Sequence, residues 1–87
     1  MKFQKDFSDG VESYNKGEEI RPIEFAFDNE YLSGIRILVK LLDRDKIVDV
    51  DLGLAVDYEE TRLLLKKPRD KQEEYLRNMI LGNKYGI

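Results

Sequence analysis

Apolar and polar residues alternate with a period of two through the middle of the chain. The alternation is clearest at about 34–42 and 46–56, and a shorter stretch at 22–28 repeats it. Because successive side chains of a β-strand point to opposite faces, each stretch predicts a strand with one buried face. A helix across 35–42 is the rival interpretation. It rests on apolar positions that also have helical spacing: Tyr31, Ile35, Leu38, Val39 and Leu42.

A hairpin is expected to join the two longer stretches. If the chain turns at Arg44–Asp45, Val39 faces Val50 in the apolar row and Lys40 faces Asp49 on the opposite face. A shift by one residue would turn the whole apolar row to the wrong face, so the pattern favours this register. We therefore expect Val39 and Val50 in the core.

One strand on each side of the hairpin would complete a four-stranded antiparallel meander. The apolar residues of 22–28 match those of the second strand in three pairs: Phe27 with Ile35, Phe25 with Ile37, and Ile23 with Val39. Residues 61–67 are expected to form the fourth strand, beside 46–56. A short helix over 58–67 is the alternative, because Asp57 and Glu60 have the spacing of a helix capping box.

Helices are expected at both ends of the chain. Near the N-terminus, apolar residues recur at helical intervals: Phe3, Phe7, Val11 and Tyr14. This spacing predicts a helix over 2–16, which Gly17 would end. Pro68 would begin a second helix, which Gly82 is expected to terminate.

The elements together predict a single domain of the α+β class over residues 1–87. The expected order is α-β-β-β-β-α, with both helices on one face of the sheet, because an apolar sheet face must be covered. A chain of this length buries only about 60–65% of its unfolded surface. We therefore expect a thin core.

The composition argues against several kinds of site. The chain has no Cys and no His, so thiolate metal ligands, disulfides and the commonest general base are excluded. The formal net charge is -3, which is too balanced to indicate nucleic-acid binding by charge alone. We expect neither enzymatic activity nor a bound cofactor.

Apolar runs in this chain are short. None exceeds three residues, so we expect neither a membrane-spanning helix nor a signal peptide. A secreted domain of this size would usually need disulfides. We therefore expect a cytoplasmic protein that does not bind membranes, including one made in the host cytoplasm by a virus such as a phage.

Acidic residues cluster around the hairpin at Asp43, Asp45, Asp49 and Asp51. Asp49 and Asp51 would lie roughly 7 Å apart along one strand face, too far to hold one small cation without a third ligand, so we expect no metal site. The stretch 48–57, with Asp51 followed by Gly53, resembles the first strand of ribonuclease-H-like nucleases and sugar-kinase ATPases. Those folds need further carboxylates on later strands, which too few residues remain to supply.

The basic residues are concentrated in the segment 62–77. It contains Arg62, Lys66, Lys67, Arg69, Lys71 and Arg77. Such a segment could bind phosphates, so nucleic-acid binding is the alternative function. The competing interpretation is a solvated turn and helix start, because Asp70 interrupts the run and acidic residues follow it.

A candidate protein interface lies on the sheet face that the helices would leave open. Four apolar residues are expected there, flanked by two bases: Leu38, Leu42, Ile47 and Leu64, with Arg36 and Lys40. An apolar centre with a charged rim is typical of a binding surface. We therefore expect a small protein-interaction module, an accessory factor, regulator or inhibitor, that docks on a larger protein or on a second copy of itself.

Overall fold

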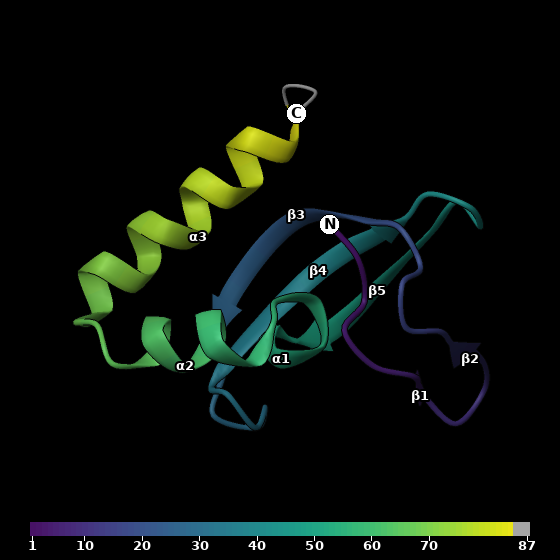
Figure 1. Ribbon diagram of the computed structural model, residues 1–87, viewed down its shortest axis with the longest axis horizontal. Helices are drawn as coiled ribbons and strands as arrows, with labels where there is room; N and C mark the ends of the chain where they lie inside the picture. The colour runs from purple at the N-terminus through teal and green to yellow at the C-terminus, as the bar shows by residue number, and fades with distance from the viewer. Residues whose placement is uncertain (85–87) are drawn as a thin grey trace.

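Alternating apolar residues form the central sheet of the computed structural model, which describes residues 1–84 (Figure 1). Strands β3 (Ile20–Phe27), β4 (Ile35–Leu41) and β5 (Lys46–Asp51) are antiparallel, in the order β3-β4-β5. Every second side chain of β4, from Ile35 to Leu41, is buried, as a strand with one covered face requires. The prediction of strands in these three regions is confirmed, and the helix across 35–42 is excluded.

The β4–β5 hairpin has a different register from the predicted one. Val39 pairs with Val48, and Lys40 pairs with Ile47, where Val50 and Asp49 were expected. The cause is a four-residue loop over 42–45, in which Asp45 has a left-handed φ of 52°. A longer loop moves the pairing by two residues. Such a shift leaves every side chain on its predicted face, so the facing prediction holds although the pairs were wrong.

The pairing of β3 with β4 contains a bulge. Phe27 pairs with Ile35 and Phe25 with Ile37, as predicted. The predicted pairing of Ile23 with Val39 is wrong, because Pro22 takes that position and Ile23 is left without a partner on β4. A bulge of this kind inserts one extra residue and bends its strand.

Two short helices occupy regions that were predicted as strands. One replaces the end of the strand predicted over 46–56, and the other replaces the strand predicted over 61–67. Helix α1 (Leu52–Ala55) is capped by Asp51, whose carboxylate accepts a hydrogen bond from the Gly53 N–H at 2.8 Å. Helix α2 (Tyr58–Leu65) is capped by Asp57, which accepts from the Glu60 N–H at 3.0 Å. The strand over 61–67 was therefore wrong, and the helical alternative is confirmed. Local capping outweighed the cross-strand matching on which the strand prediction rested.

The N-terminal segment is a small hairpin, and the helix over 2–16 was wrong. Strands β1 (Phe7–Ser8) and β2 (Ser13–Tyr14) pair with each other around Gly10, which has a φ of 91°. The Asp9 carboxylate closes the turn by accepting hydrogen bonds from the Val11 and Glu12 N–H groups. The aromatic residues of the predicted stripe still pack together, since the Phe7 and Tyr14 rings stack with centroids 4.9 Å apart.

Helix α3 (Arg69–Lys84) follows Pro68 as predicted. It continues through Gly82, so the predicted end of the helix was wrong. Helix α3 runs alongside β3 at one edge of the sheet, and the β1–β2 hairpin lies beyond β5, toward the other edge (Figure 1). No helix within residues 1–84 is both long and apolar enough to cross a membrane.

One face of the sheet is covered. Its inward side chains form a single core with Phe3 and Tyr14 of the N-terminal segment, Leu64 of α2 and Leu76 of α3. The molecule is thus a small α+β structure with a three-stranded and a two-stranded antiparallel sheet and helices in its C-terminal half. The predicted four-stranded meander is therefore wrong, since only three strands form the central sheet, and the N-terminal helix is replaced by the hairpin.

Candidate functional site

The second face of the central sheet carries a row of side chains that none of the described core residues covers. The strand pairings put nine side chains on this open face. They are Arg21, Glu24 and Ala26 on β3, Arg36, Leu38 and Lys40 on β4, and Ile47, Asp49 and Asp51 on β5.

Charges on the open face are partly neutralised by ion pairs. The Arg36 guanidinium lies 3.4 Å from the Asp49 carboxylate, and the Lys40 ammonium lies 3.1 Å from that of Asp45. Glu24 and Arg21 take part in no ion pair among residues 1–84. The face therefore keeps one free carboxylate and one free guanidinium.

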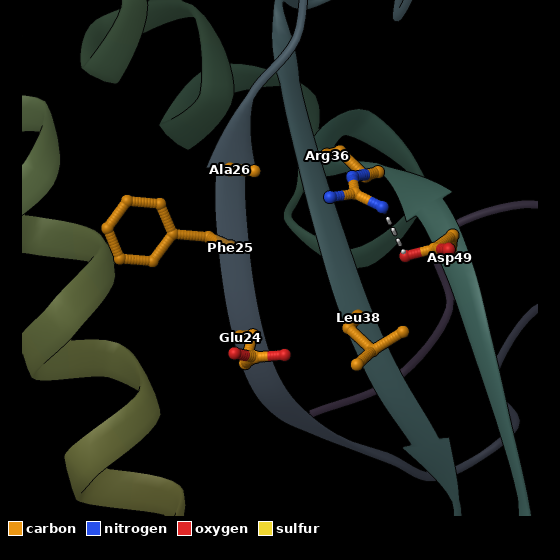
Figure 2. A pocket seen from close by; sticks show the side chains of 6 residues that line it. All are labelled: Glu24, Phe25, Ala26, Arg36, Leu38 and Asp49. Atoms are coloured by element: carbon orange, nitrogen blue, oxygen red, sulfur yellow. Dashed lines mark hydrogen bonds and ion pairs between the residues drawn. The ribbon is translucent and has the colours of Figure 1, made fainter.

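A shallow pocket of about 50 Å³ lies at the centre of the open face (Figure 2). Ala26 and Leu38 line it, and Glu24 and the Arg36–Asp49 pair stand at its edges. The neighbouring Phe25 points away, toward α3. This hollow has room for the tip of one side chain, with apolar contact below it and a free carboxylate beside it.

Most of the predicted interface residues lie together. Arg36, Leu38, Lys40 and Ile47 share the open face, and Leu42 begins the adjoining loop. Leu42 and Ile47 are 45% and 53% exposed, so this surface presents apolar area to solvent.

Leu64 was expected on the same face, and that placement was wrong. It is 2% exposed, because residue 64 belongs to α2 and its side chain points into the core.

The basic segment 62–77 is spread over two helices, and most of its charges are engaged. Arg62 pairs with Glu59, Lys71 with Glu74 and Arg77 with Glu73. The guanidinium of Arg69 lies 3.9 Å from the centre of the Phe27 ring. Three bases of the segment, Lys66, Lys67 and Arg69, have no ion pair within the described chain, and of these Lys66 and Lys67, at the turn between α2 and α3, have no aromatic contact either.

A larger hollow was not foreseen from the sequence. A groove of about 630 Å³ is lined by residues of the N-terminal segment, the β3–β4 loop, α1 and α2. Its main lining side chains are Lys5, Leu32, Asp51, Leu54, Tyr58 and Leu65. The available signal was the capping pattern at Asp57, since a helix starting there puts Tyr58 and Leu65 on one side.

Both surfaces combine apolar area with a few charges, an arrangement that suits noncovalent recognition of another molecule. No protein-family model matches this chain, and neither the curated proteins nor the solved structures contain a significant match to it, so its function has to be argued from these two surfaces.

Proposed function

We propose that this chain is a protein-binding module that docks on a larger partner through the open face. The observation that carries this proposal is the apolar area of exposed Leu42 and Ile47 and half-buried Leu38, which lies among the charged side chains of the open face. Specific interfaces have this composition, with apolar contacts at the centre and polar contacts around them.

The apolar centre would supply most of the affinity. Full burial of an exposed Leu or Ile side chain contributes about 1.5–3 kcal/mol, whereas an exposed ion pair contributes about 0–1 kcal/mol. Charges such as Glu24 and Arg21 would instead select the partner, because like charges across an interface are strongly unfavourable.

The charge pattern of the open face favours a foreign partner over a second copy. Glu24, Leu38 and Asp49 form one row across the strands, while Arg36 and Lys40 flank Leu38 along β4. A two-fold axis along the strands would place Glu24 of one copy over Asp49 of the other. An axis across the strands would place Arg36 over Lys40. Both of these arrangements bring like charges together, which disfavours a dimer whose axis runs along or across the strands, and we take a different protein as the occupant.

Affinity capture with matched variants tests this proposal. Leu38→Glu puts a charge at the centre of the face, and Val11→Glu makes the same change at an exposed position on the β1–β2 turn. We expect the wild type and Val11→Glu to capture the same protein from the native host and Leu38→Glu to lose it, with thermal midpoints unchanged. Retention of every captured protein by Leu38→Glu would place the interface elsewhere.

Nucleic-acid binding has weaker support. Phosphate contacts require free cations, and the segment 62–77 offers chiefly Lys66 and Lys67. A gel shift at two salt concentrations tests this alternative, since binding through phosphates must weaken steeply as salt rises.

A further inference from the structure

The groove near the end of the sheet is a second candidate binding surface, separate from the open face. Its walls come from four segments that are distant in sequence: the N-terminal segment, the β3–β4 loop, the β5–α1 junction and α2. Of the residues that form the open face, only Asp51, at the end of β5, also lines it. It therefore needs its own explanation.

Hydrogen bonds fix the walls of the groove. The Asp51 carboxylate accepts from the Ser33 N–H at 2.8 Å, the Ser33 hydroxyl at 2.9 Å and the Gly53 N–H at 2.8 Å. These bonds tie the β3–β4 loop to the start of α1. On the other side, the Gln4 N–H donates to the Leu54 carbonyl at 2.8 Å. The hollow is thus held by the fold before any ligand binds.

Apolar side chains protrude around the mouth of the groove. Leu32 is 99% exposed and Tyr58 is 75% exposed, and Leu65 lies beside them on α2. Exposed apolar side chains that surround a hollow, in contrast to single scattered ones, mark an interaction site.

The shape favours a polypeptide as the occupant. The volume of about 630 Å³ would also suit a small ligand, which normally buries most of its surface. A small ligand inside the hollow would leave Leu32 and Tyr58 in water, however. A helix laid along the groove could cover both with side chains from successive turns.

Lys5 is the charged side chain of the groove that is available to an occupant. Asp51 also lines the groove, but both of its carboxylate oxygens already accept hydrogen bonds from the chain. Lys5 forms no ion pair within the described chain. We propose that the groove docks an amphipathic helix of a partner protein, whose apolar face fills the hollow and whose Asp or Glu side chain pairs with Lys5.

Selection from a displayed library of random peptides, each long enough for several helical turns, tests this proposal on the intact chain. We expect the selected peptides to carry apolar residues at helical spacing and at least one acidic residue. Synthetic copies should become helical when bound, as circular dichroism would show, and should shift the methyl resonances of Leu32, Leu54 and Leu65.

Two matched pairs of variants complete the test. Leu32→Asp should weaken binding at least about tenfold, while Val11→Asp, which changes another highly exposed apolar residue that does not line the groove, should not. Lys5→Gln should weaken only the peptides that keep their acidic residue, while Lys16→Gln should leave all peptides unchanged. Because Leu32 is fully exposed, loss of binding in its variant cannot come from unfolding.

Several outcomes would overturn the helix proposal. One is a set of peptides that bind Leu32→Asp as tightly as the wild type, and another is peptides that bind in an extended form. A medium-chain fatty acid that saturates the groove while no peptide does so would assign it to a small amphiphile. Leu38→Glu separates this site from the open face, since it should leave peptide binding in the groove unchanged.

Discussion

Asp51 is the residue on which most of the local geometry depends. It is the last residue of β5, the cap of α1 and the anchor of the β3–β4 loop through Ser33. From the sequence, a metal ligand and a nuclease-type carboxylate were both considered at this position, and neither was expected. The structure instead gives each of its oxygens a hydrogen-bond donor from the chain itself.

Replacement of Asp51 by Asn should destabilise the fold. Asn has only one acceptor oxygen, so its amide group would meet a backbone N–H donor that the carboxylate now satisfies. We expect a loss of about 1–2 kcal/mol in the free energy of unfolding, measured by urea titration. Asp45→Asn is the control and should stay within about 0.5 kcal/mol, because Asp45 is exposed and Asn tolerates its left-handed backbone. If both variants lost the same stability, the hydrogen bonds of Asp51 to Ser33 and Gly53 would not contribute as described.

The raised pKa of Tyr75 should make the stability of the fold fall at alkaline pH. Burial disfavours the phenolate, and the Tyr75 hydroxyl donates to the Glu60 carboxylate at 3.1 Å; together these raise the pKa of Tyr75 from 10.0 to about 12. A folded-state pKa above the unfolded one means that this stabilisation is fully present below pH 10 and is lost as pH rises through about 12.

Spectrophotometric titration of the tyrosines checks this prediction. The difference between the wild type and Tyr75→Phe should titrate well above the ordinary tyrosine pKa, and Glu60→Gln should bring it back toward that value. The thermal midpoint of the wild type should fall more steeply than that of Tyr75→Phe above pH 10. A Tyr75 that titrates like free tyrosine would contradict the buried contact with Glu60.

Among the elements, helix α2 shows how neighbouring residues of a short apolar run can differ in burial. Leu63 and Leu64 are neighbours, yet Leu63 is 54% exposed and Leu64 is 2% exposed. Successive helical residues point about 100° apart, so a run that reads as one apolar block contributes one side chain to the core and leaves the next in solvent.

A matched pair of truncations tests this division. Leu64→Ala should lower the free energy of unfolding by about 2–4 kcal/mol, because it leaves a cavity in the core. Leu63→Ala should lower it by less than about 1 kcal/mol. Urea titrations would measure both losses, which can be compared if the m-values of the variants are equal. If the two variants lose the same stability, the helix is rotated relative to the structure described above.

The sequence could predict the faces of the strands better than the elements between them. Period-two alternation made the buried side of β4 evident, because it depends only on the chain's own geometry. The register of the hairpin could not be predicted, because it depends on the length of the loop over 42–45. No sequence pattern indicated that Asp45 has a left-handed backbone. Similarly, the spacing of Phe7 and Tyr14 fits a helical stripe as well as a hairpin pair, and the Asp9 turn decided between them.

The candidate sites were predictable to different degrees. Four of the six predicted interface residues could be placed on the open face, because face membership follows from alternation alone. Leu64 could not, since its placement depended on whether 58–67 is strand or helix. The groove could not be predicted from the sequence, because Lys5, Leu32 and Tyr58 come together only when four separate segments pack against each other.

At the scale of the whole molecule, the two surfaces give the chain two places for contact, and the charges of the open face disfavour a dimer whose axis runs along or across the strands. We therefore expect a monomer in the absence of a partner. Analytical ultracentrifugation should give the mass of one chain at all concentrations used for binding. A stable dimer that Leu38→Glu dissociates would show that the open face does pair with itself and would overturn the argument from like charges.

The bulge at Ile23 determines where the central sheet can change in length. A strand whose side chains alternate between two faces cannot lose a residue, because every later side chain would turn over. Ile23 is the exception in β3, since the pairing with β4 passes from Pro22 to Glu24 without it. Its deletion would join the two halves of the strand into an uninterrupted ladder with every remaining side chain on its present face. Related chains that are one residue shorter in this sheet are therefore expected to have lost this position.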